Sequence, residues 1–143
     1  MTKTQIALIQ ESWRRLLPDA ARLGHRFYVR LFEIEPGLKP MFAGANLKRQ
    51  EHALVTGLAY VVNTLDSPAL LDDALRGLGA RHKRYGVQTS HYAVVGRALM
   101  ETLEEGLADL WTAQHAAAWA SAFAMVSRSM RAGAAQTAAT ITA

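Results

Sequence analysis

A histidine at the end of one amphipathic segment is the residue of this sequence best placed to do chemistry. In residues 68–82, Leu71, Leu75 and Leu78 recur at helical spacing, and His82 follows Leu78 by four residues, so its imidazole lies on the same inward face. A buried histidine usually forms a hydrogen bond with a carbonyl group, and an imidazole is also a common ligand. The other segments of the chain decide between these two roles.

A tyrosine and a glutamine form a second polar set on inward faces. Tyr28 lies on the stripe that contains Phe27, and Gln50 lies one turn before Leu54 on another helical segment. From facing helices, both side chains can project into one pocket. They can form hydrogen bonds with each other or with nearby carbonyl groups, or they can donate hydrogen bonds to a ligand.

Helix signals run along the chain, and we find no strand signal. Thr2 and Gln5 match a capping box, Pro18 stops the first segment, and Gly86 ends the segment of His82. We expect a loop at residues 42–46. We expect about seven helices, beginning at Thr2, Asp19, Pro36, Asn46, Ser67, Thr89 or Ser90, and Thr112. Such a chain is all-α, with helices crossing at steep angles around a pocket.

Composition narrows the function classes. The 143 residues are 50% hydrophobic, which predicts one domain with one core. The absence of cysteine excludes disulfides, thiolate chemistry and iron–sulfur clusters. Lysine and arginine are scattered, which argues against nucleic acid as a partner, and no apolar run or signal-peptide pattern indicates a membrane, so we expect a cytoplasmic protein. Hydrolase motifs and phosphate-binding loops are also missing.

The last residues differ in composition from the rest. After Arg131 only small and polar residues and Ile141 follow, which provide little apolar surface to offset the entropy cost of ordering. The sequence therefore predicts a domain at residues 1–132 and a disordered tail at residues 133–143.

Several strings together resemble globins, in particular single-domain bacterial haemoglobins of the Vitreoscilla type, the globin domain of flavohaemoglobins, and neuroglobin. The resemblance covers the chain from about Thr4 to Arg131 and implies a 3-on-3 helical sandwich around haem b. It depends on the order and spacing of Gln10–Arg14, Phe27–Pro36, Phe42, Leu78–Val87, His91–Gly96 and Ala118–Trp119.

The resemblance assigns a role to each candidate residue. It makes His82 the iron ligand, and it places Phe42 against the haem face. Tyr28, Gln50 and Leu54 match the distal set of flavohaemoglobin-type globins, where the phenol and the amide can donate hydrogen bonds to bound dioxygen, which implies high oxygen affinity. The residues expected to line the proximal side and edge of the haem are Leu78, Val87, Tyr92 and Val95.

Some family features differ here. Tyr92 matches the tyrosine that orients the proximal histidine in flavohaemoglobins, but the accompanying glutamate position falls near Ala134. Ala53 replaces a basic residue that often binds a haem propionate, so Arg81, Arg84 or Lys48 are the expected substitutes. The remaining histidines are expected not to bind iron, although a helix movement that brings His52 inward stays an alternative. The missing glutamate, the missing basic residue at Ala53 and the position of His52 therefore determine which of the family's residue roles apply to this chain.

Two functions stay open. The first is reversible binding of O2, CO or NO, for storage, delivery or buffering of oxygen. The second is nitric oxide dioxygenation, for which we expect a separate reductase. A sensor or haem-free interaction module is a third possibility, disfavoured by His82 and Phe42. We expect a monomer or a weak homodimer.

Overall fold

The computed structural model describes the backbone of residues 1–142 and the side chains of residues 1–136, and this part of the chain is helical without strands. Six α-helices and three short 3-10 helices follow one another. They are α1 (Lys3–Leu16), η1 (Leu17–Asp19), α2 (Ala20–Ile34), η2 (Pro36–Phe42), α3 (Leu47–Thr64), α4 (Pro68–Arg84), α5 (Thr89–Leu107), η3 (Ala108–Leu110) and α6 (Ala113–Thr142).

Local sequence signals set most of the helix ends. The predicted capping box of α1 is confirmed, because the backbone N–H of Gln5 donates to Thr2 Oγ1 and the Thr2 N–H donates to Gln5 Oε1, both at 3.1 Å. Asn46 Oδ1 accepts from the Arg49 N–H at the start of α3. Gly86 follows α4 with a φ of 96°, a conformation that glycine adopts without steric cost.

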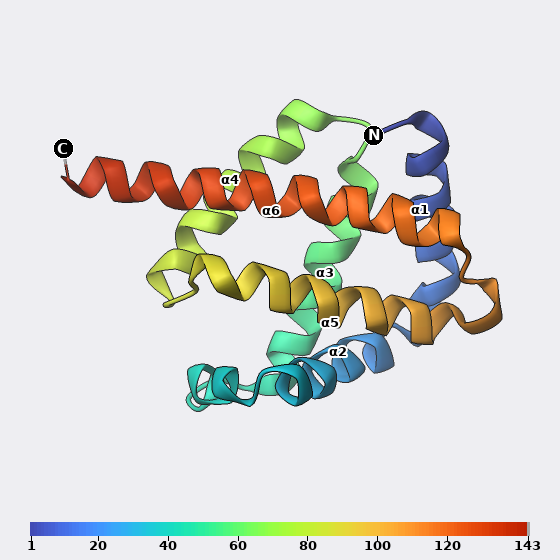
Figure 1. Ribbon diagram of the computed structural model, residues 1–143, viewed down its shortest axis with the longest axis horizontal. Coiled ribbons are helices and arrows are strands. Elements are labelled where there is room, and N and C mark those ends of the chain that lie inside the picture. The colour runs from blue at the N-terminus through green and yellow to red at the C-terminus, as the bar shows by residue number, and fades with distance from the viewer. Residues whose placement is uncertain (143) are drawn as a thin grey trace.

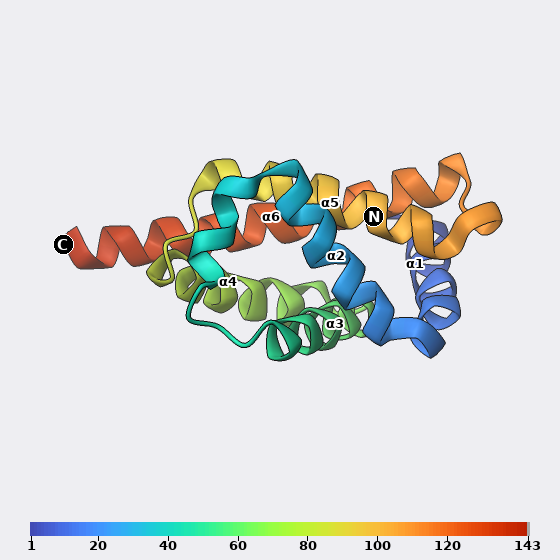
Figure 2. The ribbon, with the colours of Figure 1, turned by 90° about the horizontal axis from the view of Figure 1, so that it is seen from below.

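The helices form two crossing layers (Figures 1 and 2). One layer contains α1, α3 and α4, and the other contains α2, α5 and α6. Helices α5 and α6 run side by side in opposite directions, and α3 crosses them steeply (Figure 1). The most extensive contact joins α4 to α6. This is the all-α 3-on-3 arrangement that the sequence predicted.

The tightest part of the core lies where α1, α5 and α6 meet. Ile9 and Leu103 are fully buried there, and Trp119 is almost fully buried. The indole N–H of Trp119 donates to Ser12 Oγ at 3.0 Å, and the Ser12 hydroxyl donates to the Leu8 carbonyl at 2.7 Å. The buried polar atoms of this region therefore have partners, as a stable core requires.

Small residues bring α4 and α6 into close contact. Gly79 and Gly133 are both buried, and a Cβ at either position would overlap a backbone carbonyl of the other helix, that of Met130 or Arg76. The predicted disordered tail began at residue 133, but residues 133–136 belong to α6 and pack against α4. The side chains of residues 137–143 lie outside the described part. No described helix has the length and hydropathy that crossing a membrane requires.

Candidate functional site

His82 lies in the last turn of α4 and is half-buried. Its Nδ1 atom is 2.9 Å from the carbonyl oxygen of Leu78, one turn earlier in the same helix. A carbonyl can only accept, so Nδ1 carries the proton and Nε2 holds the lone pair. No described residue forms a hydrogen bond with Nε2. The carbonyl contact expected of a core histidine is thus present, and it leaves the second nitrogen available as a ligand.

Electrostatics keep this imidazole neutral at neutral pH. Burial lowers the pKa of His82 below its ordinary value of 6.5, and the positive charge of Arg81 lowers it further, while the hydrogen bond to Leu78 opposes this change. A neutral imidazole is the form that binds a metal ion.

An aromatic cluster joins α2 to η2. The ring of Tyr28 lies 5.0 Å from that of Phe27 and 5.5 Å from that of Phe42, in both cases edge to face. Phe32 also lies 5.5 Å from Phe42. Edge-to-face contacts of this kind fix ring orientation. The sequence placed Phe42 in a loop, whereas it is the last residue of η2, a helix that begins at Pro36 and includes Pro40.

The hydroxyl of Tyr28 is protonated over the physiological range. Burial, together with the negative charge of Glu51, raises its pKa to about 12. Glu51 is itself 3.1 Å from Nδ1 of His25, which is exposed. No described residue forms a hydrogen bond with the Tyr28 hydroxyl or the Gln50 amide, so the two do not satisfy each other. Sequence reasoning missed Glu51, because α2 and α3 approach each other only in the folded chain.

Apolar side chains of several elements are half-buried, including those that the sequence predicts to line the site. This distinguishes them from the core residues around Ile9, which are covered on all sides. Their half-burial leaves apolar surface that a flat apolar ligand could cover. The half-buried set includes the predicted residues Leu54, Leu78, Val87, Tyr92 and Val95, and also Phe32, Val55, Leu58, Phe123 and Val126.

Two segments meet at one end of this region. A Cβ built at Gly86, after α4, would lie 3.8 Å from Cε of Met41 in η2. The ring of Tyr85 lies 6.2 Å from that of His82. The turn that follows α4 therefore lies next to η2, and together they bound the region that contains His82 and Phe42 (Figure 2).

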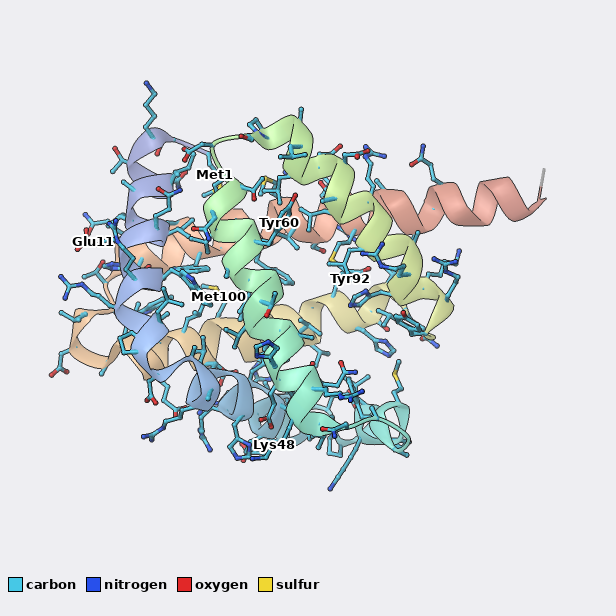
Figure 3. The ribbon with its side chains drawn as sticks, turned by 180° about the vertical axis from the view of Figure 1, so that it is seen from behind. Met1, Glu11, Lys48, Tyr60, Tyr92 and Met100 are labelled. Atoms are coloured by element: carbon cyan, nitrogen blue, oxygen red, sulfur yellow. The ribbon has the colours of Figure 1, made fainter. Side chains whose placement is uncertain are left out.

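Tyr92 lies near the C-terminal half of α4 (Figure 3). Burial raises its pKa, and Arg131 opposes this change. The described hydrogen bond of His82 goes to Leu78 and not to Tyr92. Ala134, near the position that the resemblance assigns to the flavohaemoglobin glutamate, presents its backbone carbonyl to the ammonium of Lys83 at 3.5 Å. The cations suggested for a propionate, Arg81, Arg84 and Lys48, are exposed.

The other histidines have separate roles. His52 is exposed on α3. His91 Nδ1 accepts from the Gln88 N–H at the start of α5, and His115 Nδ1 accepts from the Thr112 N–H at the start of α6. The described residues contain no cluster of three or more histidine, cysteine or acidic side chains able to hold a metal ion.

Two surface pockets lie away from this region. One, of about 230 Å³, is bounded by α1, α2 and α5 and includes Arg15 and Arg22. The other, of about 360 Å³, lies between α1 and α3 near Gln10. Neither includes a predicted site residue, so the geometry around His82 and Tyr28 defines the candidate site.

The family model for globins matches residues 25–130 of this chain. The matched segment begins before Tyr28 and ends after the core residues of α6, so it includes both sides of the candidate site. The chain belongs to the globin family.

Relatives of similar length are found in plants. Anaerobic nitrite reductases of Gossypium hirsutum and Casuarina glauca are 32% and 29% identical to this chain. Both alignments cover 85% of this chain, and 83% and 85% of the relatives. A third relative, an anaerobic nitrite reductase of Oryza sativa subsp. indica, is 28% identical over 85% of this chain and 88% of its own length.

Solved structures of similar shape come from several sources. An engineered carbene transferase, described as a candidate nitric oxide dioxygenase from Rhodothermus marinus, superposes with a TM-score of 0.86 at 25% identity, covering 100% of this chain and 99% of its own. A hexacoordinated heme protein from an anhydrobiotic tardigrade gives 0.85 at 20% identity, with coverage of 94% and 95%. A bacterial globin from Campylobacter jejuni gives 0.82 at 21% identity, with coverage of 94% and 97%.

Proposed function

We propose that this globin binds haem b non-covalently and uses it to bind dioxygen and other diatomic gases reversibly. The observation that carries the proposal is the state of His82: a neutral imidazole, with Nδ1 bonded to a carbonyl and Nε2 free among the described residues. In metal sites, a ligating histidine typically donates its other N–H to such an acceptor. The donor chemistry and the accessible apolar surface both fit haem.

The chain's residues divide into two sets around that ligand. His82 would provide the axial nitrogen, and Phe42, Leu78, Val87, Tyr92 and Val95 would cover the apolar surface of the ring. When bound, haem supplies iron that binds O2, CO or NO and exchanges single electrons. Tyr28, Gln50 and Leu54 would lie on the other side, where the phenol remains protonated and can donate a hydrogen bond to a polar gas ligand.

Haem titration tests this proposal. Purified protein should bind haem in a one-to-one ratio, and its reduced form should show reversible spectral changes with O2 and with CO. A matched variant, Arg22→Gln, changes an exposed cation that lines a pocket without predicted site residues, and it should behave as the wild type does. Absence of a saturable one-to-one spectral transition in folded protein would refute the proposal.

Nitric oxide dioxygenation is a second candidate, favoured by the name of the Rhodothermus marinus protein. The reaction combines NO, O2 and one electron to give nitrate, so it needs an electron donor for each turnover. The protonated Tyr28 and Gln50 would serve oxygen binding and dioxygenation equally. Sustained nitrate formation from NO with a reductase, in excess of one per haem, would support the enzyme, whereas a single turnover would support a binding protein.

Nitrite reduction is a third candidate, favoured by the names of the plant relatives. One nitrite takes up one electron and two protons and gives NO and water. The reaction requires anaerobic, reduced protein, so it can be measured separately from the other two. NO release from nitrite under these conditions, lost in His82→Ala, would support this activity, and unchanged nitrite would exclude it.

A further inference from the structure

Two segments of the chain carry positive charge with no acidic residue to offset it. Residues 36–50 and 74–100 together contain half of the 16 lysines and arginines and none of the 12 acidic residues. The formal charge of the whole chain is only +4, so the remaining residues carry net negative charge. The sequence therefore has a strong charge asymmetry that its overall composition hides.

The two segments meet at one end of the molecule, although residues 74–100 also extend from there along α5 toward α1 (Figure 3). Met41 of the first reaches Gly86 of the second, where its Cε would be 3.8 Å from a Cβ. Helix α1 lies at the opposite end in both views (Figures 1 and 2). Lys48 is at the start of α3, on the side of the molecule where η2 lies (Figure 3). His82 belongs to this end as well, in the last turn of α4.

Five exposed cations at this end have no carboxylate partner among the described residues. They are Lys39, Lys48, Arg49, Arg81 and Arg84. By contrast, Arg26 and Arg30 both pair with Glu105, and Arg76 pairs with Asp72. The neighbouring Lys83 donates to a backbone carbonyl. The unpaired cations are thus free to attract an external anion.

Helix electrostatics account for only some of these cations. Arg81 and Arg84 lie in the last turn of α4, where positive charge stabilises the helix dipole. Lys48 and Arg49 lie in the first turn of α3, where positive charge opposes the dipole, and no acidic residue offsets them there. Their position costs helix stability, so helix formation does not account for them.

Exposed apolar side chains accompany the cations. Met41 is 40% exposed, Leu47 is 39% exposed and Tyr85 is 72% exposed. They come from η2, the start of α3 and the residue after α4. Apolar groups within a charged rim are typical of protein–protein contacts. We call the five cations and these three apolar residues the basic end surface.

We infer that the basic end surface docks an acidic electron-donor protein, which reduces the haem of this globin. The inference rests on the proposed function, because each candidate activity beyond gas binding consumes one electron. In the redox step, ferric haem gains one electron and a flavin on the donor protein loses one. Two haem propionates could neutralise at most two of the five cations, so positive charge remains to attract the carboxylates of the partner.

A charge-reversal pair tests the inference. Lys39→Glu with Arg49→Glu changes two cations of the surface, neither of which is an expected propionate partner. Lys3→Glu with Arg22→Glu makes the same change in net charge with exposed, unpaired residues of α1 and α2. Absorption spectra first establish that all three proteins bind haem, so failure of the proposed function is recognised separately.

The probe is flavodoxin, an acidic flavoprotein, reduced photochemically and mixed with the ferric proteins without oxygen. We expect the surface variant to be reduced about tenfold more slowly than the wild type at low salt, and the control variant to differ by less than about threefold. Calorimetric titration with oxidised flavodoxin should show weaker binding by the surface variant than by the wild type and the control variant. High salt should remove the difference.

Three results would overturn the inference. Equal slowing in both double variants would attribute the effect to net charge. Unchanged reduction and unchanged affinity in the surface variant would exclude docking there. Binding of duplex DNA or of phosphatidylglycerol vesicles that the surface variant loses, with no change toward flavodoxin, would assign the surface to a nucleic acid or a membrane.

Discussion

His82 Nδ1 lies 2.9 Å from the carbonyl oxygen of Leu78, and this contact determines which nitrogen of the imidazole is available. With the proton held on Nδ1, the lone pair is on Nε2. The same contact orients the ring from within its own helix. In this chain a backbone carbonyl therefore performs the orienting task for which the family resemblance suggested Tyr92.

The lowered pKa of His82 predicts an acid-dependent loss of stability in the haem-free protein. Because the folded-state pKa is below the unfolded value of 6.5, the unfolded chain binds the proton more tightly. This contribution to stability is complete above 6.5 and is lost as the pH falls through the folded-state pKa. Thermal unfolding across this range should show a steeper loss for the wild type than for His82→Gln. If the stability of the two proteins fell in parallel as the pH was lowered, the lowered pKa of His82 would be contradicted.

Tyr28→Phe should increase the O2 dissociation rate much more than the CO dissociation rate. Bound O2 is more polar than bound CO and gains more from the phenol donor. Loss of one hydrogen bond of about 1–3 kcal/mol corresponds to a change of about 5- to 150-fold. Flash photolysis and stopped-flow displacement measure both rates. Equal effects on the two gases would mean that Tyr28 acts by packing or by controlling access.

Glu51→Gln should lower the pKa of Tyr28 from about 12, because it removes a nearby negative charge. The pKa should stay above the ordinary value of 10.0, since burial is the larger cause. NMR of ring-labelled tyrosine during an alkaline titration, with Tyr28→Phe to assign the signal, gives the value directly. An unchanged or higher pKa would show that the carboxylate does not act on this phenol.

Two glycines of α4 should respond oppositely to alanine. Gly79→Ala places a methyl group against the Met130 carbonyl, and forcing α4 and α6 apart should cost about 1–3 kcal/mol or more. At Gly77 the added Cβ meets only the end of the Arg81 side chain, at 3.6 Å, so alanine should stabilise the helix by about 0.5–1 kcal/mol. Urea unfolding compares the two. Similar changes of one sign would refute the packing account.

Local sequence signals allowed the helices to be predicted. Features that depend on contacts between distant parts of the chain could not be predicted in this way. The capping box of Thr2 and the cap of Asn46 follow from residues three positions apart. Asp19 and Ser67 occupy the expected N-cap positions, but their side chains form no capping hydrogen bond. The local sequence alone does not tell whether a residue suited to an N-cap position will form the capping hydrogen bond.

The tail and the candidate site show the same limit. The absence of large apolar residues after Arg131 suggested disorder, yet Gly133 is buried because small residues allow two helices to approach closely. Periodicity and family resemblance singled out His82, Tyr28 and Phe42 as candidates. The neighbours that tune them could not, because Glu51 meets Tyr28, and Lys83 meets Ala134, only after helices distant in sequence have packed.

The most direct test of the central claim is the absorption spectrum of haem-reconstituted His82→Gly, compared with the wild type and with His91→Gly, before and after imidazole is added. We expect His82→Gly to bind haem weakly, with an altered ferrous spectrum that imidazole restores toward that of the wild type. His91→Gly should retain the wild-type haem spectrum. Wild-type haem affinity and an unchanged ferrous spectrum in His82→Gly would contradict the assignment of His82 as the iron ligand.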